Sequence, residues 1–510
     1  MNAATRHSII GLTRNAVHCF RKAGNWGIRW RWGPVRSATS SLFTQSTNFT
    51  PNDLAILEWS DSETVLTKGE CLKRGVILTH NPEIFRVNQE KSTSASSAKI
   101  LFVDDSSAAS MAARFLRQNK HGFLIYREHN DYNNARQLLT ALKSRVTKSL
   151  KSPRTKELNI AQIWHHQRRW KREQTHMLNR LLLQVDSGSH RESNLKLDVP
   201  YRRAPKEVIS DVVQNSFRET ILSSQESTFL ISLRELLGLI GSREWKRKGM
   251  LIQLPGVSPS SSKVPDKDTS LEYEIYPSHG VFMPTRREYL DLLFQQKRLP
   301  IVEEGNLVAM DVGTGTGVIA AQMLLQHRNV ISHITCTDSS SSAIECAREN
   351  FERLSLTKQT TLVQTNDGNM FPKSSPESKF DLITCNPPWI PGRGDSLLDT
   401  SVYDPESKFL KKFLRTARQY LRDETSQVWL VISDLAERLG LRDPGTLTTL
   451  FKEGGLQVLD TSHTSPWHPK VVNTKNATKK HQMQDLPEIT TARTGEVTTL
   501  YILQPAPDSL

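Results

Sequence analysis

The sequence predicts an α/β protein, with a mostly parallel sheet of seven strands in its C-terminal half and a mixed α/β domain before it. Seven short apolar runs follow Glu272 and alternate with helical stretches, which is typical of doubly wound sheets. A glycine-rich motif joins the first run to a helix. Residues 256–270 have the composition of a linker, so we expect domains at 51–255 and 271–510. The expected strands are 307–310, 334–337, 361–364, 382–385, 428–432, 457–459 and 498–503.

The positive charge of the chain is concentrated at its start. The 510 residues carry a formal net charge of +14, and the first 40 contain seven Lys or Arg and no acid. An acid-free, arginine-rich and serine-containing start is typical of a mitochondrial transit peptide. We therefore expect residues 1–45 to direct the protein to the mitochondrial matrix. The alternative is a basic arm that contacts nucleic acid.

Two kinds of site are not expected from the composition. The five cysteines form no CxxC pair and stand beside no histidine cluster, which predicts a reducing compartment and no bound metal. No apolar run is long enough to cross a bilayer, so we expect no membrane insertion.

The N-terminal region has helix and strand signals in turn. Strands are expected at 100–103 and 123–126, and Asp131 can cap a helix over 132–147. Ser232 and Glu235 have the spacing of a capping box, which predicts a helix that ends near Gly241.

Two basic segments in this region contain tryptophan. The helix expected over 163–180 carries Trp164 and Trp170 among Arg, Lys and His, and Trp245 precedes a basic cluster at 246–248. Basic and aromatic side chains together can bind a nucleic-acid backbone and stack on bases. For 163–180 we slightly favour the alternative, a solvated helix whose tryptophans face the core.

The glycine-rich motif has the form D-x-G-x-G-x-G and precedes a helix expected over 318–325. Gly313, Gly315 and Gly317 allow a ligand to approach the backbone closely, and the helix start offers free N–H groups. Asp311 opens the motif, and a carboxylate there suits an ammonium group better than a pyrophosphate.

Two further carboxylates follow the next strands. Asp338 ends the second strand and can accept hydrogen bonds from ribose hydroxyls, as in nucleotide-binding α/β folds. Asp367 follows the third strand and could accept from an adenine amino group, although a turn residue in Asn-Asp-Gly is nearly as good an interpretation.

The sequence Asn-Pro-Pro-Trp ends the fourth strand. The prolines stiffen the loop and fix the Asn386 side chain and the Pro387 carbonyl. These two oxygens can accept both N–H groups of a planar amide or aromatic amine and direct its nitrogen lone pair at a methyl donor. Trp389 can stack on the planar group. These three residues are the predicted catalytic group.

The two motifs together resemble class I S-adenosylmethionine-dependent methyltransferases of the small-domain group, which modify amino or amide nitrogens. That group includes release-factor glutamine methyltransferases and N6-adenine or N2-guanine methyltransferases. The resemblance implies a seven-stranded Rossmann-like sheet with one antiparallel strand, and S-adenosylmethionine as cofactor. The segment 280–288 is similar to the loop that covers the cofactor there, which implies contacts from Phe282 and Pro284. Trp389 departs from the tyrosine usual in the glutamine enzymes.

Three functions follow from these patterns. The first is methylation of an exocyclic amino nitrogen, with an RNA base favoured and the N-terminal domain recognising the substrate. The second is the same chemistry on a protein glutamine amide. The third is a cofactor-binding scaffold without turnover.

Overall fold

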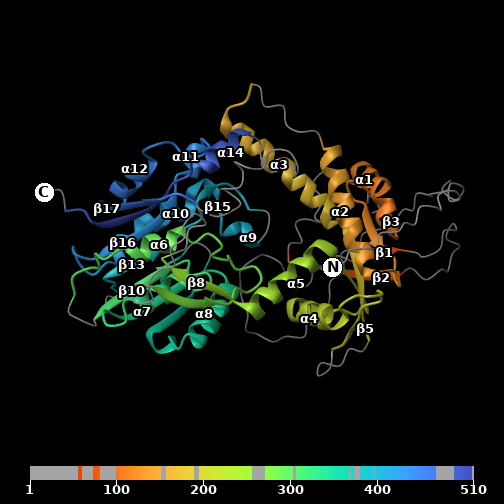
Figure 1. Cartoon of the computed structure of the whole chain (residues 1–510), viewed down its shortest axis with the longest axis horizontal. Helices are drawn as coiled ribbons and strands as arrows, with labels where there is room; N and C mark the ends of the chain where they lie inside the picture. Colours follow the sequence, from red (N-terminus) through yellow and green to blue (C-terminus); the bar gives the residue numbers. More distant parts are fainter. Residues whose placement is uncertain are drawn as a thin grey trace, which may run out of the picture.

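The computed structural model forms two lobes (Figure 1). It describes residues 56–59, 73–80, 99–150, 157–188, 195–255, 270–302, 306–366, 369–372, 379–394, 397–466 and 487–507. The expected transit peptide at 1–45 lies outside the described residues, as does the expected linker except for Ser270.

The N-terminal lobe is built on a seven-stranded mixed sheet with the order β1-β2-β7-β5-β4-β3, in which β6 pairs with β5. Its strands are β1 (Ile56–Trp59), β2 (Lys73–Leu78), β3 (Ile100–Val103), β4 (Phe123–Tyr126), β5 (Leu181–Ser187), β6 (Leu197–Asp198) and β7 (Thr228–Ser232). Its helices are α1 (Ala109–Gln118), α2 (Tyr132–Ser149), α3 (Ile160–Asn179), α4 (Lys206–Ser223) and α5 (Leu233–Lys248). The strands expected at 100–103 and 123–126 are confirmed, and Asp131 caps α2 by accepting the N–H of Asn133.

The expected capping box at the start of α5 is wrong. The Ser232 side chain makes no capping hydrogen bond, and Glu235 instead accepts from the backbone N–H of His80 at 2.7 Å. The expected stop at Gly241 is also wrong, because the helix continues to Lys248. It ends at Gly249, whose φ of 73° suits a residue without a Cβ.

The C-terminal lobe contains a sheet with the order β12-β11-β10-β13-β16-β18-β17, in which β18 is antiparallel to both of its neighbours. All seven expected strands are present. They are β10 (Leu307–Val312), β11 (Ile331–Asp338), β12 (Thr360–Gln364), β13 (Leu382–Cys385), β16 (Gln427–Ser433), β17 (Leu456–Thr464) and β18 (Thr498–Pro505). Helices of this lobe include α6 (Glu288–Gln295), α7 (Val318–Gln326), α8 (Ser341–Arg353), α10 (Lys408–Ala417), α11 (Leu435–Arg438), α12 (Thr446–Glu453) and α14 (Pro487–Thr494).

A two-stranded ribbon, with one strand on each side of the expected linker, packs into the C-terminal core. It pairs β8 (Met250–Leu254) with β9 (Leu271–Ile275), and Ile252 and Leu254 are fully buried among residues of α6 and α7. The apolar face of β8 therefore places the start of the second lobe near residue 250.

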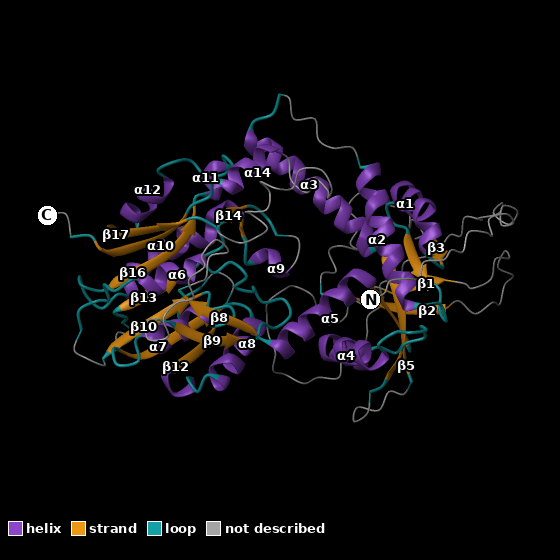
Figure 2. Cartoon of the chain, viewed as in Figure 1, coloured by secondary structure: helices purple, strands orange, loops and turns teal. Residues whose placement is uncertain are grey.

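Helix α3 connects the lobes at a second place (Figure 2). Trp164 is 4% exposed and packs in one apolar cluster with Leu439 and Ile489 of the C-terminal lobe. The Arg168 guanidinium lies 3.8 Å from the centre of the Tyr403 ring, and it donates to the Arg393 carbonyl. The tryptophan expected to face a core does so, but the core belongs partly to the other lobe.

Candidate active site

The glycine-rich motif forms the turn between β10 and α7. Gly313, Gly315 and Gly317 have φ values of 74°, 55° and 78°, which favour glycine. A Cβ at Gly317 would lie 2.8 Å from the Phe351 ring of α8, so this glycine lets two helices approach. A Cβ at Gly315 would meet nothing within 4 Å, so the turn faces open space there. A ligand can therefore approach the backbone at Gly315.

The buried Asp311 carboxylate links this turn to the neighbouring strand through two hydrogen bonds. It is 2% exposed, and its oxygens accept from the Thr314 hydroxyl at 2.7 Å and the Thr384 hydroxyl at 2.9 Å. Burial raises its pKa from the ordinary 3.8 to about 6, although the two hydroxyls oppose this shift. The sequence did not point to these threonines. Contact between Asp311 and a ligand ammonium stays a prediction.

Asp338 lies beside the open turn, at the carboxyl end of β11. One of its oxygens accepts from the backbone N–H of Gly315 at 3.0 Å, and the other from that of Ser340 at 2.9 Å. Burial raises the pKa of this half-buried carboxyl. Each oxygen keeps a lone pair with which it can accept a ribose hydroxyl. Contact between Asp338 and the ribose hydroxyls stays a prediction.

The segment before α6 is tied to the same turn through Asn350 of α8. The Asn350 amide accepts from the N–H of Tyr276 at 2.8 Å and donates to the Thr316 carbonyl at 3.0 Å. This side chain holds residues 276–281 against the glycine-rich motif. Further along the segment, Phe282 is half-buried and Pro284 is buried. Their expected cofactor contacts stay predictions, and Asp367 lies outside the described residues.

The predicted catalytic motif follows β13, next to β10 in the sheet. Pro387 is buried, whereas Asn386 and Trp389 are half-buried. The indole Nε1–H of Trp389 donates to Asn386 Oδ1 at 2.9 Å, so this oxygen already receives an N–H from a planar group. After the motif, β14 (Ile390–Pro391) pairs with β15 (Tyr403–Asp404), which anchors the loop. The motif is thus held at the carboxyl edge of the sheet, where the glycine-rich turn also lies.

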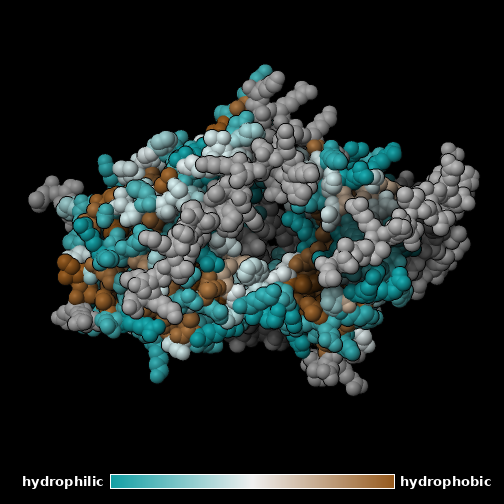
Figure 3. All heavy atoms as spheres, viewed as in Figure 1, coloured by the Kyte–Doolittle hydropathy of each residue, from teal (hydrophilic) through white to brown (hydrophobic). Residues whose placement is uncertain are grey.

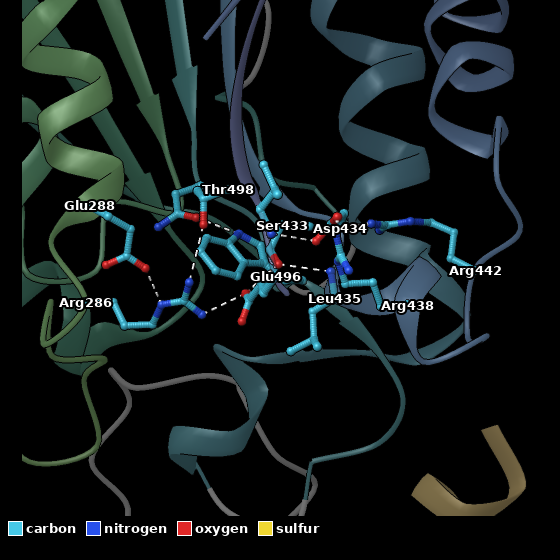
Figure 4. Close-up of polar contacts among 12 residues, drawn as sticks. Arg286, Glu288, Ser433, Asp434, Leu435, Arg438, Arg442, Glu496 and Thr498 are labelled. Carbon is cyan, nitrogen blue, oxygen red and sulfur yellow. Dashed lines mark hydrogen bonds and ion pairs between the residues drawn. The ribbon is translucent and has the colours of Figure 1, made fainter. Parts of the chain in front are cut away.

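The Trp389 ring lies beside a buried ionic network, whose ion pairs of Arg286 with Glu288 and Glu496 are drawn in Figure 4. The Arg286 guanidinium lies 4.9 Å from the centre of this ring. It forms ion pairs with Glu288 and Glu496, which are 1% and 2% exposed, and it donates to Thr498. These carboxylates raise the pKa of Arg286 against the opposing effect of burial.

The sequence contains only a partial signal for this network. Arg286 and Glu288 lie in the segment that resembles the family, but Glu496 is 210 residues from Arg286 and follows no recognisable motif. One oxygen of Glu288 is buried without a hydrogen-bond partner. The Arg286 guanidinium balances the charges of Glu288 and Glu496, which would otherwise be costly to bury.

Neither a metal site nor a membrane span is found in the described part of the chain. Among those residues no group of three or more His, Cys, Asp or Glu could hold a metal ion. No helix within the same ranges has the length and apolar character that crossing a membrane requires.

Residues 273–453 match the sequence profile of the methyltransferase small domain family. The chain is 25% identical over 235 residues to a release factor glutamine methyltransferase of Fusobacterium nucleatum, a match covering 42% of this chain and 61% of that enzyme. It is 35% identical over 81 residues to a tRNA1(Val) (adenine(37)-N6)-methyltransferase of Vibrio campbellii, covering 16% of this chain and 31% of the relative. The chain therefore spans less than two thirds of either relative.

Solved structures of methyltransferases are also similar to this chain. One is a putative methyltransferase complexed with SAH. The match covers 46% of this chain and 53% of that protein, with 12% identity and a TM-score of 0.31. The family match and the sheet order confirm the expected class I methyltransferase fold, with S-adenosylmethionine as its cofactor. The open turn at Gly315 and the available oxygens of Asp338 fit a nucleoside with an amino-acid tail.

Proposed function

We propose, from this family match, that the protein transfers a methyl group from S-adenosylmethionine to a planar amino or amide nitrogen, with an RNA base as the favoured acceptor. The observation that carries the proposal is the hydrogen bond from the Trp389 indole to Asn386 Oδ1. A flat N–H donor already occupies this oxygen, so a substrate N–H can take its place there.

Each part of the site has a role in this reaction. The bound cofactor supplies a methyl group on a positively charged sulfur. Asn386 Oδ1 and the Pro387 carbonyl accept the two substrate N–H groups and direct the nitrogen lone pair toward that methyl group. The new N–C bond forms as the S–C bond breaks, and the same oxygens stabilise the positive charge on nitrogen. The nitrogen then loses a proton to water.

Two observations bear on the acceptor. Trp164 is unavailable for stacking on bases, because it is buried between the lobes. Trp170 is half-buried, and its indole N–H donates to the Leu150 carbonyl. Trp245 remains, with 45% exposure, beside exposed cations on α5. This surface favours RNA as the methyl acceptor. The similarity to release factor glutamine methyltransferases favours a protein glutamine amide as the second candidate.

The test uses the full chain, labelled S-adenosylmethionine, and separated RNA and protein fractions. Asn386→Ala serves as the control, since it removes the acceptor oxygen. Label that enters RNA only with Asn386 present is the expected result. Label in a protein band would replace the RNA acceptor with a glutamine amide. Unchanged labelling by Asn386→Ala would refute the catalytic role of this residue.

The acid-free segment 1–45 supports the further proposal that the protein acts in mitochondria. A fluorescent fusion should enter the organelle, and neutral replacements at its seven basic residues should prevent import. Import of the neutral version would contradict the proposal.

A further inference from the structure

One face of α5 is exposed along the whole helix. Its members recur at spacings of four and three residues, which places them on one side of an α-helix. They are all exposed: Arg234, Gly238, Gly241, Trp245 and Lys248. We call this set the α5 face. At 1.5 Å per residue it extends over roughly 21 Å.

Among the described residues, none packs against the two glycines of the α5 face. A Cβ at Gly238 or at Gly241 would meet nothing within 4 Å, so no neighbouring element needs their small size. Glycine in a helix interior is destabilising relative to alanine or glutamine. The glycines therefore keep the middle of the face flat, so that another molecule can lie against the helix backbone.

Cations stand at both ends of this flat stretch. Within the described residues, neither Arg234 nor Lys248 forms a hydrogen bond or an ion pair, whereas Lys246 pairs with Glu349 and Arg247 with Glu244. Among the described residues, the two cations that form no close ion pair are thus the ones that share the exposed face. Trp245, at 45% exposure, presents an indole beside the Lys248 end.

The Arg234 end of the α5 face lies near the catalytic loop. Desolvation lowers the pKa of Arg234 although its side chain is exposed, and the Asp399 carboxylate opposes this shift, so the two groups interact electrostatically. Asp399 belongs to α9 (Leu397–Thr400), which follows the Asn386 motif, and it also lies 4.0 Å from Arg168 of α3. Figure 3 shows the surface hollowed between the lobes, where Figure 1 places α3, α5 and α9.

We propose that the α5 face binds single-stranded RNA and leads it to the Asn386 site; this inference rests on the proposed function. Arg234 and Lys248 neutralise phosphates, Trp245 stacks on a base, and the glycines let the sugar-phosphate backbone lie close to the helix. At 3.4 Å per stacked nucleotide, the face has room for about six nucleotides.

The first experiment measures binding of a fluorescein-labelled single-stranded RNA of about 12 nucleotides to the full chain at several salt concentrations. The charge variant is Arg234→Gln/Lys248→Gln. Its matched control is Arg114→Gln/Arg117→Gln, which removes two exposed cations from α1 of the same lobe. The charge variant should lower the slope of log K against log salt by about 1.4, because each phosphate contact contributes about 0.7. An equal effect of the control would overturn the proposal.

The second experiment separates binding from folding. Gly238→Gln/Gly241→Gln should raise the melting temperature by roughly 2 to 6 °C, since glutamine favours helix, yet weaken RNA binding about tenfold or more. Damage to the fold would lower both quantities. Unchanged RNA binding by this variant, or by Trp245→Ala, would overturn the proposal.

Methylation distinguishes failure of this inference from failure of the proposed function. Asn386→Ala should lose methylation while its RNA binding keeps the salt dependence of the wild type, because asparagine carries no charge. If the wild type methylates RNA and all α5 variants do so equally well, the inference fails and the function stands. If the wild type methylates only protein and does not bind the RNA, both the RNA acceptor and the α5 assignment are wrong.

Discussion

Replacement of Asp311 by asparagine should stabilise the protein in a pH-dependent way. Burial raises the pKa of this carboxyl from 3.8 to about 6. Between these values the folded protein holds a proton that the unfolded chain has released. The contribution of Asp311 to stability is therefore most favourable below pH 4 and is lost as pH rises toward and through 6. An asparagine amide is neutral at every pH and avoids this loss, since the hydroxyls of Thr314 and Thr384 can rotate to fit it.

The size of the effect follows from the two pKa values. They differ by about two pH units, and each unit corresponds to 1.36 kcal/mol, which gives on the order of 3 kcal/mol above pH 6. For a domain of this size 1 kcal/mol shifts the melting temperature by about 2–4 °C. About 1 kcal/mol of this penalty is already present at pH 4.5, so the melting temperatures of Asp311→Asn and wild type should separate by a further 4–8 °C or so between pH 4.5 and pH 7.5.

The assay is thermal unfolding of cofactor-free protein at a series of pH values. Comparing the two proteins at each pH cancels effects from other titrating groups. A separation that stays constant with pH would refute the reasoning about Asp311. A second measurement, the affinity for S-adenosylhomocysteine, tests the predicted ammonium contact, because losing an ionic contact should weaken binding at pH 7.5.

Three further predictions concern the glycine-rich turn, the network beside Trp389 and the contact of α3 with the C-terminal lobe. Gly317→Ala should destabilise the protein by about 2–5 kcal/mol in urea unfolding, through its positive φ and a clash with α8, whereas Gly315→Ala should cost less because its Cβ meets open space. Arg286→Lys should lower kcat about tenfold at unchanged cofactor affinity, because lysine loses the planar contact with Trp389. The same substitution should cost less when Trp389 is already Phe, and an equal loss of kcat in that background would contradict action through Trp389. Arg168→Gln should increase hydrogen exchange in the loop after the catalytic motif, because it removes the hydrogen bond to the Arg393 carbonyl. Unchanged exchange would show that Arg168 does not hold this loop.

The C-terminal sheet was predictable because each of its strands is a short apolar run bounded by turn residues. The glycine-rich turn and the Asn386 loop were also predictable, since their chemistry lies within a few consecutive residues. Gly317 illustrates the limit of this approach. The motif predicted the residue, but its contact with Phe351 of α8 depends on how two helices pack.

Other features depend on partners far along the chain. Glu235 has the spacing of a capping residue, yet its carboxylate bonds to His80, which is 155 residues away. Trp164 was expected to face a core, but the identity of that core follows only from the position of α3 against the second lobe. Arg286 and Glu496 meet for the same reason. Local patterns define elements and short loops, whereas side-chain partners across elements require the packed structure.

The position of α3 has a consequence for how such a protein can evolve. Its N-terminal lobe supplies Trp164 to an apolar cluster that Leu439 and Ile489 of the other lobe would otherwise expose to water. A gene fusion that exchanged only the recognition lobe would leave this patch bare and would favour aggregation. Successful recombination between relatives must therefore carry α3 along with the catalytic half, so the inherited unit is larger than the methyltransferase domain itself.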